Sequence, residues 1–134
     1  MTKQPFRSML LAGALLCAAL PVRAGDVYVV THPGVTLTAD EVREVFTGDK
    51  QSAGGLKLVP MDNSAAQADF LAKVVKVDAA KYASVWAKKG FREGINPPAV
   101  RNTDLEVAAA VKATPGAVGY LSKPAPDLKL VQKY

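Results

Sequence analysis

The stretch Thr114-Pro115-Gly116-Ala117-Val118-Gly119-Tyr120 combines a helix end, a forced turn and a short strand within seven residues. Pro115 cannot continue the helix that precedes it, and Gly116 supplies a turn conformation that residues with side chains resist. The residues after this turn have the pattern of a strand, in which Gly119 leaves room for another backbone or a ligand. The stretch therefore predicts a tight junction between a helix and a strand.

The beginning of the chain predicts a secretory signal peptide. Lys3 and Arg7 provide a basic start, the uncharged run 8–22 follows, and small residues stand before an expected cleavage site after Ala24. The run is shorter than the roughly 20 apolar residues that a membrane span needs, which favours a cleaved signal over a membrane anchor. We therefore expect residues 1–24 to be removed and one mature domain, residues 25–134, to be periplasmic or secreted.

Loss of this leader would change the charge and the thiol content. The full chain has 17 Lys and Arg against 12 Asp and Glu, and losing Lys3, Arg7 and Arg23 leaves 14 basic residues and a net charge of +2. Basic residues do not form a stripe with aromatic ones, which argues against nucleic acid as a partner. Cys17 is the only cysteine, so the mature chain is expected to lack disulfides and cysteine metal ligands.

Strand and helix patterns alternate along the mature chain. We expect strands at residues 26–31, 56–61 and 128–131, in addition to the strand after Gly116. A polar loop, residues 49–55, is expected before the second of them. Such alternation predicts a single α/β layer structure, with a mixed or parallel sheet flanked by about four helices.

Capping patterns indicate where the helices begin. Ser/Thr-x-x-Glu/Gln boxes start at Thr38, Ser64 and Thr103, and Asp78 can cap a further helix that ends near Gly90. Each of these helices has apolar residues at helical spacing, as expected for one buried face. The predicted buried residues are Val42, Val45 and Phe46, then Phe70, Leu71, Val74 and Val75, then Tyr82, Val85 and Trp86, and last Val107, Ala110 and Val111.

Several of these motifs occur together in a known family. The chain resembles the periplasmic phosphate-binding component of ABC transporters, in the type II periplasmic-binding-protein superfamily. The resemblance covers nearly the whole mature chain and implies one lobe of that fold. The matching pieces are Leu-Thr-x-x-x-Val-x-x-x-Phe-x-Gly from Leu37 to Gly48, the strand and helix start from Leu58 to Phe70, Trp86, Pro97, and the terminal Pro-Gly-Ala-Val-Gly-Tyr.

The sequence departs from this family where the family holds its ligand. Full-length phosphate binders close two lobes over the oxyanion and typically carry Arg-x-x-x-Ser-Gly-Thr in this segment. Here Pro60 replaces the arginine, Ser64 is retained, and Ala65-Ala66 replaces Gly-Thr. A charge-assisted hydrogen bond contributes roughly 1.5–3 kcal/mol, so the missing arginine predicts an affinity about 10- to 100-fold lower. A second copy of the chain or a partner protein would have to supply the second lobe, which closes over the oxyanion in the full-length binders.

The candidate oxyanion site is the start of the helix after the second strand. An oxyanion would be bound there by the Ser64 hydroxyl and by the backbone amides of Ala65, Ala66 and Gln67, because helix starts offer unpaired N–H groups. The alternative is that Ser64 is only a helix cap, which contributes about 1 kcal/mol to stability.

Four more residues have candidate roles near such a site. Asp62 either accepts a hydrogen bond from a protonated oxyanion or caps the turn, and Thr38 is a second helix start that could contact an anion. Arg92 and Arg101 flank the rigid Asn96-Pro97-Pro98 connector, and either could replace the lost cation.

Catalytic and metal chemistry find little support. His32 is the only histidine, and the residues around Ser64 do not resemble a nucleophile elbow. Carboxylates lack the spacing of metal ligands, so neither a metal nor a cofactor is expected, and the protein is predicted not to be an enzyme. Tyr82 and Trp86 have a helical spacing that suits core packing.

These sequence features are compatible with two functions. The first is an exported solute-binding protein for phosphate or a similar small oxyanion, serving an ABC transport system. The alternative is a non-catalytic interaction or sensor-accessory protein that keeps the lobe, has lost the ligand, and docks on a membrane transporter or sensor. Pro60, Ala65 and Ala66 favour the alternative, whereas Asp62 and Ser64 favour the first.

Overall fold

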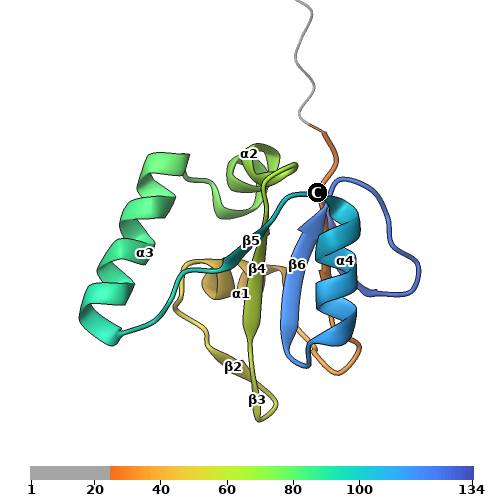
Figure 1. The fold of residues 1–134 in the computed structure, drawn as a ribbon, viewed down its shortest axis with the longest axis horizontal. Helices are drawn as coiled ribbons and strands as arrows, with labels where there is room; N and C mark the ends of the chain where they lie inside the picture. The colour runs from red at the N-terminus through yellow and green to blue at the C-terminus, as the bar shows by residue number, and fades with distance from the viewer. Residues whose placement is uncertain (1–24) are drawn as a thin grey trace, which may run out of the picture.

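A computed structural model shows a mixed five-stranded sheet with helices on both faces (Figure 1). The structure describes residues 25–134, so the predicted signal peptide and Cys17 lie outside the described residues. Its elements are β1 (Tyr28–Thr31), α1 (Ala39–Phe46), β2 (Ser52–Ala53), β3 (Leu56–Lys57), β4 (Val59–Asn63), α2 (Gln67–Phe70), the π-helix η1 (Leu71–Val75), α3 (Ala79–Glu93), β5 (Ala99–Arg101), α4 (Asp104–Ala113), β6 (Ala117–Leu121) and β7 (Lys129–Lys133).

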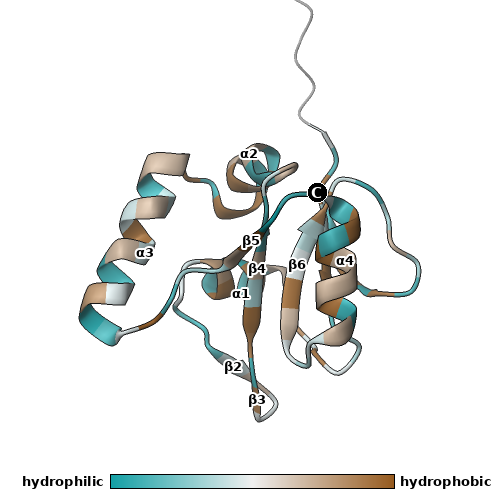
Figure 2. Cartoon of the chain, viewed as in Figure 1, coloured by the Kyte–Doolittle hydropathy of each residue, from teal (hydrophilic) through white to brown (hydrophobic). Residues whose placement is uncertain are grey.

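The sheet has the order β5-β4-β6-β1-β7. Strand β4 runs parallel to β5 on one side and to β6 on the other, whereas β1 is antiparallel to both β6 and β7. The predicted α/β class with a mixed sheet is confirmed. Apolar residues of the central strands β4 and β6 appear brown in Figure 2.

Two separate hydrophobic cores lie on the two faces of the sheet. Phe46 of α1, Phe70 of α2 and Trp86 of α3 belong to one core, and Val107 and Val111 of α4 belong to the other. The helices that follow β4 therefore cover the face opposite to the helix that follows β5.

The stretch from Thr114 to Tyr120 forms the predicted junction. Gly116 has a φ of +82°, and a Cβ atom there would collide with the carbonyl oxygen of Lys57. A Cβ at Gly119 would come within 2.8 Å of Val107 and 2.9 Å of Val111, so glycine lets α4 pack directly on β6. All five residues of β6 are buried.

Three predicted helix starts are confirmed. Thr38 and Glu41 form the reciprocal capping box of α1, the Asp78 carboxylate accepts from the Lys81 amide, and the Thr103 hydroxyl accepts from the Glu106 amide. The apolar faces that were expected to be buried are also largely correct. Among them, Val85 lines a surface pocket and Ala110 is half-buried, whereas the others are buried.

Several predicted boundaries were wrong. The strand expected at residues 56–61 is interrupted at Leu58. Its first two residues, Leu56 and Lys57, pair with Ser52 and Ala53 in a small β2–β3 hairpin, which begins in the region expected to be a loop, residues 49–55. Helix α3 continues past Gly90 to Glu93 and ends at Gly94, which has a φ of +67°. Strand β5 was not expected, since its three residues are exposed and lack a buried-strand pattern.

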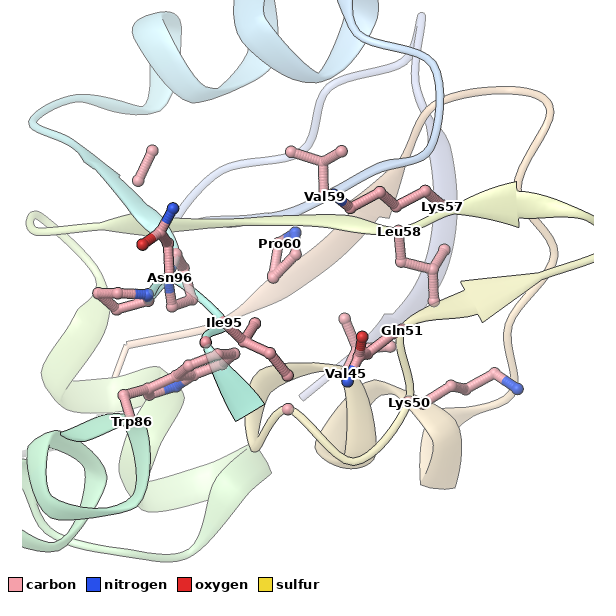
Figure 3. A pocket seen from close by; sticks show the side chains of 15 residues that line it. Val45, Lys50, Gln51, Lys57, Leu58, Val59, Pro60, Trp86, Ile95 and Asn96 are labelled. Atoms are coloured by element: carbon pink, nitrogen blue, oxygen red, sulfur yellow. The ribbon is translucent and has the colours of Figure 1, made fainter. Parts of the chain in front are cut away.

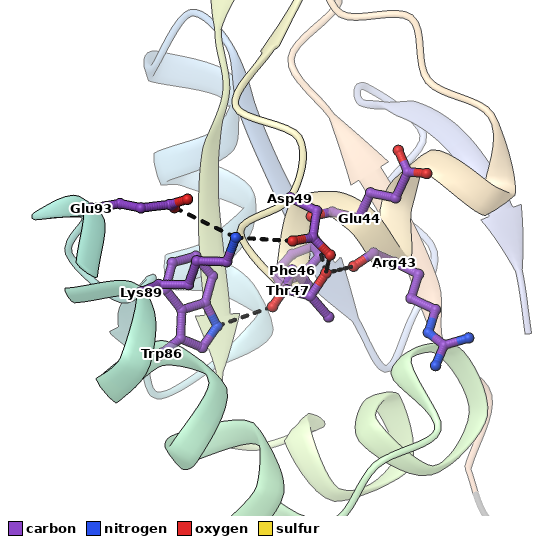
Figure 4. A network of polar contacts seen from close by, with 8 residues as sticks. All are labelled: Arg43, Glu44, Phe46, Thr47, Asp49, Trp86, Lys89 and Glu93. Atoms are coloured by element: carbon purple, nitrogen blue, oxygen red, sulfur yellow. Dashed lines mark hydrogen bonds and ion pairs between the residues drawn. The ribbon is translucent and has the colours of Figure 1, made fainter. Parts of the chain in front are cut away.

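Helix α3 is joined to the rest of the molecule by polar contacts as well as by packing (Figure 4). The Trp86 indole N–H donates to the Phe46 carbonyl oxygen at 3.0 Å, and the Lys89 ammonium lies 2.9 Å from Asp49 and 3.4 Å from Glu93. Exposed ion pairs contribute only about 0–1 kcal/mol each, so the buried indole contact is the stronger tie.

Candidate functional site at the carboxyl ends of β4 and β5

The carboxyl ends of β4 and β5 form a topological switch point. The chain leaves β4 toward α2 on one face of the sheet and leaves β5 toward α4 on the other, as the separate cores of these helices show (Figure 1). Ligands of open α/β sheets bind in the crevice at such a point. Ser64 and Arg101 meet here, since the Ser64 amide donates to the Arg101 carbonyl oxygen at 2.9 Å.

The loop after β4 is held by Asn63 rather than by Ser64. The Asn63 side-chain oxygen accepts from the Ala65 amide at 3.1 Å, and the Asn63 carbonyl accepts from the Ala66 amide at 3.0 Å. Helix α2 begins only at Gln67, and its N-cap, Ala66, provides no side-chain cap. The interpretation of Ser64 as a helix cap was therefore wrong, because the preceding carboxamide already closes this turn.

Few groups of the predicted oxyanion site remain available to a ligand. Two of the three amides assigned to it, those of Ala65 and Ala66, are bonded to Asn63. The Ser64 hydroxyl donates to the Asn102 side-chain oxygen at 3.3 Å, in an exposed contact. The Gln67 amide, at the first residue of α2, is the remaining predicted donor.

Asp62 faces the core and not the crevice. Its carboxylate is 2% exposed and accepts hydrogen bonds from the Tyr82 hydroxyl at 2.9 Å and from the Tyr120 hydroxyl at 2.8 Å. Burial raises the pKa of the Asp62 carboxyl, although both tyrosine hydrogen bonds oppose that rise. Burial, together with the nearby Asp62 charge, also raises the pKa of both phenols. The sequence had suggested that Asp62 contacts an oxyanion or caps the turn. In the structure it instead accepts the two buried tyrosine hydrogen bonds.

A carboxylate that was not singled out in the sequence lies at the crevice. Asp104 accepts from the Asn63 side-chain amide at 2.8 Å and from the amide and hydroxyl of Ser122 at 3.0 and 2.7 Å. Burial would raise the pKa of the Asp104 carboxyl, but these hydrogen bonds, and one from the Lys123 amide, outweigh burial and lower it. Asp104 is therefore ionised at neutral pH, which disfavours a second anion beside it.

The remaining predicted residues lie in different places. Arg101 ends β5 beside Ser64, whereas Arg92 lies in the last turn of α3. Thr38 starts α1, on the segment that follows β1, two strands away from β4 in the sheet, and its hydroxyl and amide are bonded to Glu41. The structure thus brings Arg101, but neither Arg92 nor Thr38, to Ser64.

Asn63 and Asp104 are the organising residues that sequence reasoning missed. An Asn before a Ser at a strand end is a turn signal, and Asp104 follows a recognised helix cap, so both carried a local signal.

Within residues 25–134, no group of His, Cys, Asp and Glu residues could hold a metal ion. None of the helices in that same range is long and apolar enough to cross a membrane.

Comparison with known proteins identifies the fold. Neither a protein-family model nor a curated protein matches the sequence. The structure is similar to that of an ABC-type phosphate transport receptor from Vibrio cholerae, with a TM-score of 0.50, 17% sequence identity and 81% of this chain covered. The match covers 47% of the receptor, so the chain spans about half its length. This protein therefore has a periplasmic-binding-protein-like fold and corresponds to a single lobe.

Proposed function

We propose that this protein is an exported, non-catalytic binding protein that keeps one lobe of a solute-binding fold and works by docking on another protein. The observation that carries this proposal is the closed loop after β4. Asn63 occupies the amides of Ala65 and Ala66, which a bound oxyanion would need.

An oxyanion would gain little at this loop. It would have to replace existing hydrogen bonds, each with a net contribution of about 0.5–1.5 kcal/mol, and it would approach the ionised Asp104. The described residues, 25–134, form a single lobe, so the opposing side of the site, which would exclude water, would have to come from elsewhere. Capture of phosphate by the isolated protein is therefore expected to be weak.

Exposed apolar side chains support a docking role. Phe91 on α3 is 93% exposed and Val100 on the edge strand β5 is 58% exposed. Aromatic residues, Phe included, are enriched at the buried centre of protein interfaces, and a fully exposed Phe gains most from being covered. A membrane transporter or sensor is the kind of partner that the resemblance implies.

Oxyanion binding at Ser64, Ala65, Ala66 and Gln67 is the second candidate function. It is supported by the switch point between β4 and β5 and by Arg101, whose backbone contacts Ser64 there. The other wall would then come from a second copy or from the partner.

Isothermal titration of the mature protein with phosphate, with sulfate as competitor, separates the two functions. We expect no saturable heat up to millimolar phosphate. Saturable binding that Ser64→Ala abolishes, and that Ser84→Ala on the exposed face of α3 leaves intact, would contradict this expectation. The oxyanion function would then replace the docking function.

Crosslinking in cells tests the docking function directly. A photoreactive amino acid at position 91 is expected to give one defined adduct with a membrane protein. The same amino acid at position 130, on the other edge strand β7, serves as control because Leu130 is also exposed, at 52%. Adducts from neither position, or the same adducts from both, would refute a specific surface at α3.

Export is tested by the mass of the protein recovered from the periplasm. A chain that begins at Gly25 is expected from the predicted cleavage after Ala24. An uncleaved chain held in the membrane fraction would favour an anchor instead.

A further inference from the structure

A pocket of about 430 Å³ opens at the amino ends of β4 and β5 (Figure 3). It lies between Trp86 of α3, Pro60 of β4 and the connector that carries Ile95 and Asn96. Its volume falls within the roughly 300–1,000 Å³ of small-molecule sites. The crevice at Ser64 lies at the opposite ends of the same two strands.

Two prolines explain why the sheet is open here. Strand β4 pairs with β6 at Val59 and Pro60 but pairs with β5 only from Met61, opposite Ala99. Further pairing would need the backbone N–H of residue 60 on β4 and then that of residue 97 before β5, and both residues are prolines. The pocket occupies the space that further strand pairing would have closed.

The apolar wall of the pocket is held in place. Trp86 is buried, and its N–H is bonded to the Phe46 carbonyl oxygen, so the ring cannot turn away. The backbone of Gly48 lies against the Trp86 ring, since a Cβ atom at position 48 would be only 3.3 Å from that ring. Gly48 also has a φ of +81°, which favours glycine. Leu58 and Ile95 complete the apolar lining seen in Figure 3. A preformed wall lowers the ordering cost of binding.

The charges at the pocket have one sign. Of its fifteen lining residues, none is acidic and two, Lys50 and Lys57, are basic. Lys50 pairs with Glu41 at 2.9 Å, whereas the exposed Lys57 ammonium has no ion pair or hydrogen bond within residues 25–134. Four other pockets on the described residues each include at least one Asp or Glu. This pocket alone among the five therefore combines apolar walls with only positive charge.

We propose that this pocket binds a small apolar carboxylate, with its ring or chain against Trp86 and its carboxylate toward Lys57. An apolar body suits the wall, and an anionic end suits a cation that has no other partner. This inference goes beyond the docking function and does not depend on it.

Trp86 reports on the pocket directly, because it is the only tryptophan of the chain. We expect phenylacetate to change the tryptophan fluorescence of the mature protein in a saturable way. Phenylacetamide, which has the same ring and no charge, is expected to bind about 2- to 5-fold more weakly, as for loss of one exposed charge pair.

Charge variants test the role of Lys57. Lys57→Gln is expected to weaken phenylacetate binding by about 2- to 5-fold and to leave phenylacetamide binding unchanged. Lys81→Gln is the matched control, since Lys81 is exposed on α3 and does not line the pocket. Both substitutions are at exposed positions, so folding should be unaffected.

Three outcomes would overturn the proposal. These are the absence of a saturable change up to about 10 mM phenylacetate, equal affinities for the acid and the amide, and equal losses in Lys57→Gln and Lys81→Gln. Ser64→Ala should leave phenylacetate binding intact. The proposal can therefore fail or stand independently of phosphate binding and of docking.

Discussion

The two ends of strand β4 differ in how their polar groups are used. At the carboxyl end, Asn63 and its neighbours bond to one another, to β6 and to α4. At the amino end, Pro60 pairs with β6 but not with β5, and an apolar pocket lies beside this gap in the pairing. The comparison teaches that a helix start is an anion site only where its amides remain free, and that a gap in strand pairing is the better indication of space for a ligand.

The largest effect is expected from Asn63→Ala, which would open the closed end. Asn63 is fully buried, and its loss leaves the Tyr120 carbonyl, the Ala65 amide and Asp104 each without one partner. We expect a loss of about 3 kcal/mol in the free energy of unfolding, measured in urea. Asn96→Ala, in the exposed connector at the other end, should cost less than about 0.5 kcal/mol. Equal losses would remove the contrast between the two ends.

The next effect concerns the wall of the open end. Trp86→Phe removes the hydrogen bond to the Phe46 carbonyl oxygen and part of the core volume, so we expect a loss of about 2 kcal/mol. Urea unfolding followed by circular dichroism measures it. A loss below about 0.5 kcal/mol would mean that the indole is not fixed by this contact.

A smaller effect on stability, dependent on pH, is expected at Asp62, which lies between the two ends of β4. Because burial raises the pKa of the Asp62 carboxyl above its ordinary value of 3.8, its contribution to stability is full below that value and is lost as pH rises through the raised pKa. The stability of the wild type relative to Asp62→Asn should therefore fall as pH increases from about 4.

Asp127→Asn provides the control with the opposite sign. The hydrogen bond from Lys112 lowers the pKa of the exposed Asp127 carboxyl, so the wild type should gain stability relative to this variant as pH rises. Thermal unfolding of the three proteins between pH 3 and 7 tests both signs. Parallel curves for the two variants would contradict the burial of Asp62.

The smallest effect is expected from Ser64→Ala. The hydroxyl makes one exposed hydrogen bond, to Asn102, so stability should change by less than about 0.5 kcal/mol. Urea unfolding beside Asn63→Ala gives the ratio of the two effects. A loss near 2 kcal/mol would show that Ser64, and not Asn63, organises the loop.

Local patterns predicted the elements better than their connections. The caps at Thr38, Asp78 and Thr103 and the turn at Gly116 were correct, because the partners of each lie within a few residues. Strand β5 was missed, since it exists only through its pairing with β4. The role of Ser64 was misread for the same kind of reason, because Asn63 and Asn102 compete for the groups around it.

The amino-acid sequence was enough to establish the α/β class, the helix faces and the helix-to-strand junction at Gly116 and Gly119, because these depend on hydrogen-bonding and steric preferences within short segments. The burial of Asp62, the closed loop at Asn63 and the pocket at Pro60 depend on contacts between residues far apart in the chain. Such contacts exist only after folding, when competition for each donor and acceptor determines which polar groups remain available for binding.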